Sequence, residues 1–488
     1  MTNFPYLRQD FAASLVVFLV ALPLCVGVAV ASGVPAELGL VTGIVGGIVT
    51  GLLRGSSLQV SGPAAGLTVL VLEAVTEFGL ATLGVIVLAA GVLQLAMGAL
   101  RLARWFRAIS VAVVEGMLAG IGLVIIAGQL YAAAGLKAPA SGVDKILGLP
   151  GAVLDAFGTA APVSLAVGAG TIAVTVGWRH LPKQARTVPG ALAAVILATA
   201  VTLAFDLPVA TVEVNGLIGS VRPPGADALG ELADPAVLGT VLAFTLIASA
   251  ESLFSAAAVD RLHDGPRTQY DKELMAQGAG NAVCGVLGAL PMTAVIVRSS
   301  ANVAAGAKTK ASRVLHGVWL LLFAALLPGA LALIPLPALA GILIHAGWKL
   351  IPFRGIATLW RGHRGEALIL VVTAVAIVTV NMFEGVLIGL ALSVAKTAWE
   401  TSHVRLEVVD KGAGPLQAHL SGNATFLRLP KILDSLEALP QDRPIVVDVS
   451  GLHHLDHACR TALGAWAERH SAVGTEPVRV TEPAKTAP

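Results

Sequence analysis

The segment Ser61-Gly62-Pro63-Ala64-Ala65-Gly66 interrupts what would otherwise be a continuous apolar, membrane-spanning stretch of the chain. The short polar segment before it, Ser56–Ser61, predicts extended backbone. We expect Pro63 in the first turn of a following helix, capped by one of the two residues before it. That helix would begin inside the membrane, with the N–H groups of Ala64 and Ala65 facing a cavity. The alternative is a kinked, tightly packed helix, because glycine and proline are common in membrane helices.

A second interruption, Leu290-Pro291-Met292-Thr293-Ala294, also precedes apolar, helix-forming sequence. We expect Pro291 near a helix start, and Thr293 offers a hydroxyl group. Arg298 follows in the same segment, and an arginine at the centre of a span costs about 2.5–3.5 kcal/mol, which makes it a candidate functional residue. Its alternative roles are to snorkel to the membrane surface or to pair structurally with a carboxylate.

A helix that begins within the membrane directs unpaired N–H groups and the positive end of its dipole at whatever lies before it. Two such helices in corresponding halves of a chain are typical of the binding site of a secondary transporter with inverted repeats. Because Arg298 adds a further positive charge, the guest that this site favours is an anion. The predicted substrate-binding residues are Ser61, Gly62, Pro63, Ala64, Ala65, Pro291, Met292, Thr293, Ala294 and Arg298.

The composition is that of an integral membrane protein. Of the 488 residues, 56% are hydrophobic and 13% are charged, whereas soluble domains carry about 25% charged residues. We expect an all-α membrane domain over residues 1–400 with fourteen membrane segments. Their approximate ranges are 11–31, 35–53, 57–78, 81–99, 108–131, 161–178, 188–205, 237–257, 275–290, 291–305, 312–328, 330–350, 366–381 and 384–398.

These segments divide into two sets of seven, about residues 8–206 and 236–400. An odd number makes the second set enter the membrane from the opposite side, which is compatible with inverted repeats. The third and tenth segments, which hold the two interruptions, are then equivalent. Most of the 32 Lys and Arg residues fall in alternate loops, and the positive-inside rule therefore places both termini in the cytoplasm.

One carboxylate lies well inside a predicted span. Glu251 lies in the eighth segment, and Ser255 shares its helix face four residues later. A desolvated carboxylate without a cation beside it binds a proton readily. Glu251 and Ser255 are therefore predicted to hold a coupling ion, either sodium or, in slight preference, a proton. A structural hydrogen-bonding role is the alternative for Glu251. Glu115, in the fifth segment, lies near a cytoplasmic end and ranks lower.

After residue 400 the apolar runs become short and charges become frequent, which indicates a separate cytoplasmic domain over residues 403–488. The alternation of predicted strands and helices favours a small α/β domain. The predicted elements are strands at Leu416–Leu420 and Pro444–Ser450, helices at Pro430–Leu439 and Ala458–His470, and a loop at Gly451–Asp456.

Several stretches together resemble the SulP family of anion transporters, to which animal sulfate, chloride–bicarbonate and prestin-type proteins also belong. The most diagnostic is LPMTAVIVRSSANVAAGAKTKAS at 290–312. The stretch VVDVSGLHHLD at 446–456 is similar to the STAS domain that follows the membrane part in this family. The other matching stretches are ALPLCVGVAVASG at 21–33, VSGPAAG at 60–66 and ASAESLFSAAAVDRL at 248–262.

The resemblance implies two inverted repeats divided into a core domain and a gate domain, a homodimer, and elevator-type alternating access. It implies that substrate lies between the half-helices of the third and tenth segments. Glu251 and Ser255 occupy the places of an acid and a hydroxyl that hold sodium in related bicarbonate carriers. The tail departs from phosphorylated STAS relatives, because His457-Ala458-Cys459 follows Asp456 where they carry Ser or Thr, so we expect no phosphorylation switch there.

The sequence thus predicts a proton- or sodium-coupled uptake carrier for a small anion, such as bicarbonate, sulfate or fumarate, in a bacterial inner membrane with its lipid. The alternatives are a nucleobase permease of the same architecture, an anion channel, and a membrane sensor that signals through the tail. Cys25, Cys284 and Cys459 fit no metal-binding spacing. Because no nucleotide-binding or catalytic motif appears either, we expect no metal, organic cofactor, enzymatic activity or nucleic-acid partner.

Overall fold

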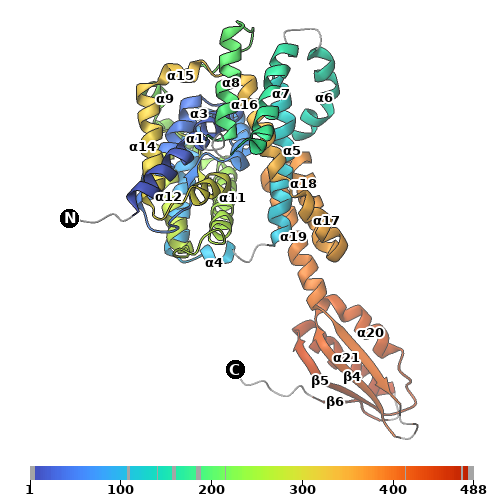
Figure 1. Cartoon of the computed structure of the whole chain (residues 1–488). Coiled ribbons are helices and arrows are strands. Elements are labelled where there is room, and N and C mark those ends of the chain that lie inside the picture. The colour runs from blue at the N-terminus through green and yellow to red at the C-terminus, as the bar shows by residue number, and fades with distance from the viewer. Residues whose placement is uncertain are drawn as a thin grey trace, which may run out of the picture. The chain divides into compact units, whose positions relative to one another are not determined.

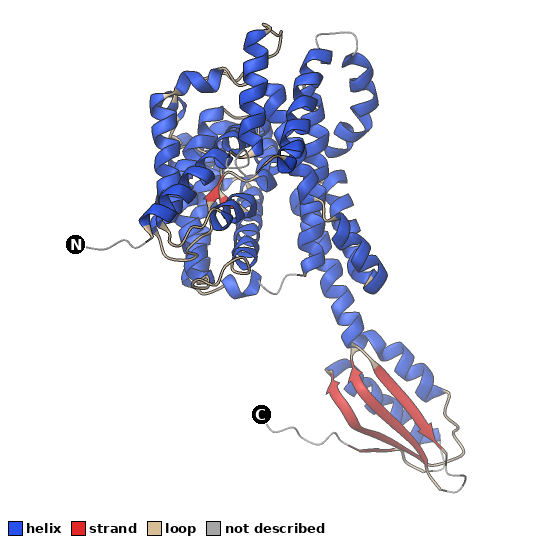
Figure 2. Ribbon diagram, viewed as in Figure 1, coloured by secondary structure: helices blue, strands red, loops and turns tan. Residues whose placement is uncertain are grey.

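The computed structural model describes residues 6–106, 110–139, 141–156, 161–182, 188–214, 216–410, 412, 414–473 and 476–481. The chain forms two compact units, Met1–Leu390 and Ala391–Pro488. The first is built almost entirely of helices, and the second contains a four-stranded sheet (Figures 1 and 2).

The first unit is a sequence of helices with short connections. Those before residue 206 are α1 (Leu7–Ala31), α2 (Ala36–Val45), α3 (Thr68–Ala99), α4 (Ala103–Phe106), α5 (Val111–Ala133), α6 (Gly142–Ala156), α7 (Ala161–Gly177) and α8 (Gly190–Ala204). Those after it are α9 (Leu217–Ser220), α10 (Ala226–Gly230), α11 (Pro235–Val259), α12 (Tyr270–Val286), α13 (Ile296–Ala304), α14 (Ala311–Leu326), α15 (Pro328–Ala332), α16 (Leu336–Leu350), α17 (Phe353–Gly362), α18 (Arg364–Thr379) and α19 (Met382–Thr401), of which the last continues past Leu390.

Helical length and composition agree with a membrane location. Among the described residues, 6 helical stretches are long and apolar enough to cross a membrane. These stretches are Leu7–Ala31, Ala65–Ala99, Val111–Ala133, Pro235–Val259, Leu336–Gly362 and Met382–Thr401.

Helix α3 is in two parts. Gly79 has φ 84° and ψ 170° within it, a backbone conformation that glycine adopts far more readily than other residues. The kink falls between the predicted segments 57–78 and 81–99. Helices α6 and α17, in contrast, were not among the predicted segments.

The helices of the first unit pack in two groups, which lie side by side in Figure 1. In one group α1 packs against α2 and α14, while α3 packs against α11 and α12. In the other, α5 packs against α16 and α18, while α7 packs against α8 and α16. Each group therefore combines helices from before and after residue 206, as two intertwined repeats would.

The second unit is a small α/β domain, as predicted. Its sheet has the order β3-β4-β5-β6, with β3 antiparallel to β4 and the other neighbours parallel. Alternate residues of β4, Leu416, Ala418 and Leu420, are buried in its core. The elements are β3 (Val404–Val409), β4 (Leu416–Ala424), α20 (Leu429–Glu437), β5 (Ile445–Leu455), α21 (His457–Val473) and β6 (Arg479–Thr481).

Three details of this domain differ from the prediction, and one of them is strand β6, which was not predicted. The loop expected at Gly451–Asp456 is wrong, because β5 continues to Leu455 and its residues Gly451 and Leu452 pair with β4. Strand β3 was not predicted, since the short run that forms it becomes a strand only through its pairing with β4.

Asp456 joins two elements of this domain. Its carboxylate accepts a 2.7 Å hydrogen bond from the Cys459 N–H in the first turn of α21, and another from the Phe426 N–H. These bonds favour the ionised carboxylate and hold the pKa of Asp456 below its usual range. Their stabilising effect is therefore complete above the unfolded pKa of about 3.9 and is lost as pH falls through the lower folded value.

Asp456→Ala should lower the unfolding free energy of the segment 403–488 by about 1 kcal/mol at neutral pH, as the loss of a helix N-cap does. The deficit should narrow as pH falls below the unfolded pKa of about 3.9, because protonation of the wild-type carboxylate weakens its hydrogen bonds. Urea denaturation at neutral pH and at acidic pH measures the unfolding free energy. The exposed Asp434→Ala on α20 is the control. An equal deficit at the two pH values would contradict this account of the cap.

Candidate functional site

The two interruptions meet in the first unit. They form strands β1 (Ser61–Gly62) and β2 (Thr293–Ala294), which pair antiparallel with Ser61 opposite Ala294. Figure 2 shows this small sheet among the helices. The Val295 N–H also donates a 2.9 Å bond to the Val60 carbonyl. Because α3 and α13 follow these strands, the pairing brings two helix starts together.

The helices begin later than the sequence predicts. A short 3₁₀ turn starts at Ala65 and leads into α3, while α13 starts at Ile296. Pro63 and Pro291 therefore precede the helices instead of occupying their first turns. Ser61 and Gly62 belong to β1 and cap no helix. The physical reason is that backbone N–H and C=O groups of the two interruptions form hydrogen bonds with each other. These residues are therefore extended and cannot belong to a helix.

Side chains of α12 form hydrogen bonds with both interruptions. Gln277 donates a 2.7 Å bond to the Ser61 hydroxyl and another of 2.7 Å to Glu273. Asn281 accepts from the Met292 N–H at 2.7 Å and donates to the Met292 carbonyl at 3.1 Å. The sequence analysis missed these residues. Their signal was the spacing of four between Glu273, Gln277 and Asn281, which puts three polar side chains on one face of the helix.

A cavity of about 700 Å³ lies between the two helix groups, in front of the paired interruptions. Six of the predicted residues line it: Pro63, Ala64, Ala65, Glu251, Ser255 and Arg298. The remaining predicted residues do not line it, because they are buried in or beside the two strands. They are Ser61, Gly62, Pro291, Met292, Thr293 and Ala294.

Arg298 lies on α13 and is 1% exposed. Its Nη2 donates a 3.1 Å bond to the Pro63 carbonyl, which belongs to the other interruption. Nε and Nη1 have no hydrogen-bond partner in the described part of the chain, and no described carboxylate forms an ion pair with this guanidinium. The side chain is thus buried and forms no ion pair with a described carboxylate. It has donors left for a ligand in the cavity.

Glu251 lies on α11 and lines the same cavity, one helical turn before Ser255. Its carboxylate packs against the backbone of Gly66, where a Cβ atom would lie 2.6 Å from Oε1 and 2.9 Å from Oε2. Glu251 Oε2 is buried without a hydrogen-bond partner among the described residues. Since an unsatisfied buried oxygen is costly, this position suits a group that binds a proton or a cation.

The charges around the cavity are mixed, with cations in excess. Arg179 and Lys349 line it together with Arg298, against the acids Glu251 and Glu115. The sequence analysis did not single out Arg179 or Lys349 as site residues. Three basic residues against two acidic ones leave a small excess of positive charge in the lining, and an excess of one sign in a cleft attracts ions of the opposite sign.

Gly66→Ala should disturb the Glu251 side chain, because the new methyl group and the carboxylate would occupy the same space. Overpacking of this kind costs about 1–3 kcal/mol, and we expect anion uptake, the activity that the sequence predicts, to fall roughly tenfold. Uptake by reconstituted protein measures the effect. Gly239→Ala on the same helix as Glu251 is the matched control, because nothing lies within 4 Å of the added methyl group. Wild-type transport by Gly66→Ala would show that the carboxylate can move freely.

Comparison with solved structures identifies the fold. The transmembrane domain of a cyanobacterial bicarbonate transporter, BicA, aligns with a TM-score of 0.67 at 23% identity, over 80% of this chain and 98% of that one. The murine anion transporter Slc26a9 in its inward-facing state aligns with a TM-score of 0.79 at 15% identity, over 98% of this chain and 86% of that one. The chain is therefore a helical membrane protein with an SLC26-like fold.

Sequence comparison identifies the family. The putative sulfate transporter YvdB of Bacillus subtilis is 26% identical over 95% of this chain and 89% of its own length. The bicarbonate transporter BicA of Picosynechococcus is 26% identical over 83% of this chain and 73% of its own. The model of the sulfate permease family matches residues 7–373. The chain belongs to the sulfate permease family of membrane transporters.

Proposed function

We propose that this protein is a secondary active carrier that takes up a small anion together with a coupling ion. The observation that carries the proposal is the antiparallel pairing of Ser61–Gly62 with Thr293–Ala294. This pairing directs two helix starts at one cavity, and Arg298 adds a cation there. Helix N-termini and a buried guanidinium with unused donors form an anion site.

The proposed architecture is fourteen membrane segments in two inverted repeats, about residues 8–206 and 236–400. The two helix groups act as a core domain and a gate domain, and the core carries substrate across the membrane by an elevator movement. The cavity supports this proposal, because residues of both helix groups line it. A movement of one group relative to the other would therefore open or close the cavity to the solution. The protein would work as a homodimer in a bacterial inner membrane, with both termini and a STAS domain over residues 403–488 in the cytoplasm.

The proposed substrate is an oxyanion. Relatives named for sulfate and for bicarbonate support this class, and fumarate carries similar carboxylate oxygens. The site offers N–H donors from two helix starts and from a guanidinium, which suit flat or tetrahedral oxyanions alike. Small side chains at Ala64 and Ala65 let such an anion approach the backbone closely.

The proposed coupling group is Glu251, with Ser255 beside it. Its unpartnered oxygen takes up a proton, or with less preference a sodium ion, when substrate binds. A positive charge taken up at Glu251 offsets the charge of the anion in the same cavity. Movement of the loaded core is then easier than movement of a core that carries an unbalanced charge.

Transport into proteoliposomes tests the function. Labelled bicarbonate, sulfate, fumarate and uracil are each offered under an imposed pH gradient or an imposed sodium gradient. The proposal expects one oxyanion to accumulate against its own gradient and uracil not to compete. Accumulation of uracil alone would favour a nucleobase permease, and large unitary currents would favour a channel. Retention of transport after deletion of residues 403–488 would separate a carrier from a sensor that signals through the tail.

A further inference from the structure

Helix α17 is a separate element, although the apolar stretch Leu336–Gly362 is long enough to be one spanning helix. Helix α16 ends at Leu350, and the next two residues leave the helical conformation, with Ile351 at φ −80° and ψ 115° and Pro352 at φ −83° and ψ 61°. A proline cannot continue the preceding helix without losing a hydrogen bond. The 10 residues of α17 then form a new helix in which none is buried.

The side chains of α17 fall on three faces at 100° per residue. Ile356 and Leu359 pack against a cluster on α5 and α18 and hold the helix to the protein. Phe353 and Trp360, by contrast, are 47% and 54% exposed. Trp348, at the end of α16, is 58% exposed, and its ring centroid lies 4.6 Å from that of Phe353.

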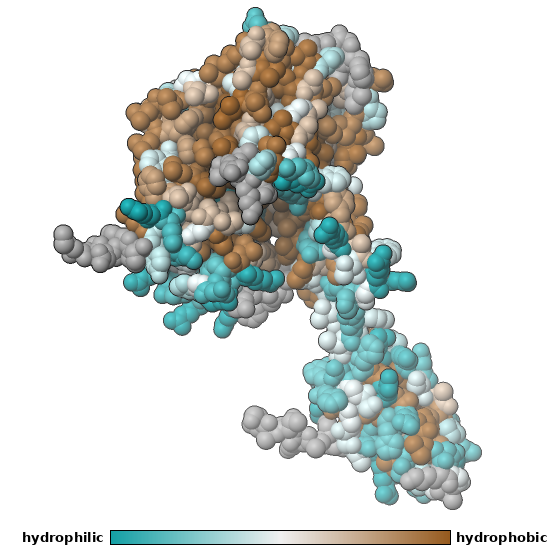
Figure 3. Space-filling view, viewed as in Figure 1, coloured by the Kyte–Doolittle hydropathy of each residue, from teal (hydrophilic) through white to brown (hydrophobic). Residues whose placement is uncertain are grey.

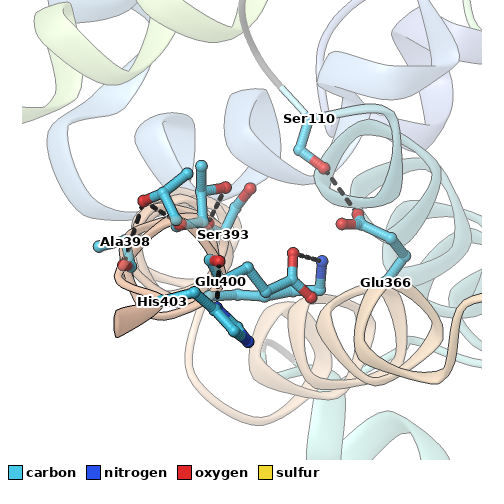
Figure 4. Close-up of polar contacts among 9 residues, drawn as sticks. Ser110, Glu366, Ser393, Ala398, Glu400 and His403 are labelled. Atoms are coloured by element: carbon cyan, nitrogen blue, oxygen red, sulfur yellow. Dashed lines mark hydrogen bonds and ion pairs between the residues drawn. The ribbon is translucent and has the colours of Figure 1, made fainter. Parts of the chain in front are cut away.

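The third face of α17 carries Arg354 and Arg361, and Arg364 follows at the start of α18. All three are exposed, and no described carboxylate forms an ion pair with any of them. The nearest acid in sequence, Glu366, accepts a 3.1 Å bond from the Ser110 hydroxyl, as Figure 4 shows. Three arginines therefore stand beside an exposed aromatic surface. Figure 3 shows hydrophilic residues, in teal, next to hydrophobic ones, in brown, on the face of the protein that it draws.

Exposed aromatic rings next to arginines are typical of a helix at the boundary between headgroups and acyl chains. We propose that α17 binds anionic phospholipid, with Phe353 and Trp360 at the acyl boundary and the three arginines on headgroup phosphates. A guanidinium binds phosphate oxygens with two parallel hydrogen bonds. The occupant is a lipid and not a second copy of the chain, because one 10-residue helix offers little of the roughly 1,200–2,000 Å² that a stable protein interface buries.

This contact would anchor the group of α5, α16 and α18 in the membrane, because α17 connects α16 to α18 and packs on α5 and α18. Lipid binding by α17 does not depend on which anion the protein transports. A failure of the lipid experiment would therefore leave the proposed carrier function intact, and a failure of anion transport would leave lipid binding measurable.

The test uses the purified full chain. Its thermal unfolding is followed in detergent while phosphatidylglycerol or phosphatidylcholine is added, and its transport is compared in vesicles of phosphatidylcholine with and without phosphatidylglycerol. We expect phosphatidylglycerol to raise both the unfolding temperature and the transport rate. The variant Arg354→Gln/Arg361→Gln/Arg364→Gln should lose both effects, with a fall in lipid affinity of about fivefold per arginine. High salt should weaken the wild-type response.

The matched control replaces three exposed arginines elsewhere in the first unit, as Arg8→Gln/Arg54→Gln/Arg261→Gln. It should keep the wild-type response to phosphatidylglycerol. An equal loss in the control, or an unchanged response in the α17 variant, would overturn the inference. An equal stabilisation by inorganic phosphate would overturn it in favour of a soluble ligand. Dissociation of an oligomer on Trp360→Ala would overturn it in favour of a second copy of the chain.

Discussion

Glu251→Gln should abolish accumulation of the anion under an imposed ion gradient, while exchange of labelled for unlabelled anion continues. The amide has nearly the same shape as the carboxylate and still fits against Gly66. It can neither take up a proton nor bind sodium as a charged ligand. Arg298 and the two helix starts, which form the proposed anion site in the same cavity, keep their own side chains and backbone. The substitution should therefore remove only the coupling of anion transport to the ion gradient.

The measurement compares two assays on the same proteoliposomes. Uptake driven by a pH or sodium gradient should fall to the level seen without a gradient, and counterflow should stay close to wild type. Glu384→Gln, an exposed Glu-to-Gln change in the first unit, is the matched control and should keep both activities. Full gradient-driven accumulation by Glu251→Gln would show that the coupling ion binds elsewhere. A parallel loss of counterflow would instead give Glu251 a role in anion binding.

The sequence indicated which residues stand out in the candidate site, but it did not predict how the two interruptions pair in space. Both interruptions and the residues Arg298 and Glu251 stand out locally, because Gly-Pro pairs and charges are rare in apolar segments. The kink at Gly79 was also visible as a break between two predicted segments. The pairing of Ser61–Gly62 with Thr293–Ala294 was not predicted, since strands of 2 residues have no periodicity and are defined only by their partner across the fold.

The same reason explains the displaced helix starts. Proline at the first position of a helix is a local preference, and at Pro63 and Pro291 the backbone pairing between distant segments outweighed it. Helix α17 was missed for a different reason. The twelfth predicted segment ended at residue 350, and Arg354, Arg361 and Arg364 were counted with a basic loop. Their spacing of seven and three residues, with apolar residues between them, also fits an amphipathic helix.

The largest loss of anion affinity should follow Arg298→Gln. The guanidinium is the one cation at the junction of the two interruptions among the described residues that line the cavity, since Arg179 and Lys349 lie on other helices. A hydrogen bond to a charged group contributes about 1.5–3 kcal/mol, which corresponds to roughly a 10- to 100-fold rise in the dissociation constant. The anion affinity of Arg298→Lys should lie between those of Arg298→Gln and the wild type. Lysine keeps the positive charge, but it lacks the planar guanidinium that can donate to the Pro63 carbonyl and to a ligand at the same time.

Arg313→Gln separates a loss of binding from a loss of folding. Arg313 is also an arginine of the first unit that is almost fully buried, at 2% exposure. It donates to the carbonyls of Leu53 and Gln59 at 3.1 and 3.4 Å and does not line the cavity. We expect Arg313→Gln to lower the unfolding temperature and leave the anion affinity of the folded fraction unchanged. Arg298→Gln should weaken binding even in molecules that elute as folded protein. Equal anion affinity in the two variants would mean that Arg298 serves the structure alone and that the helix starts bind the anion without it.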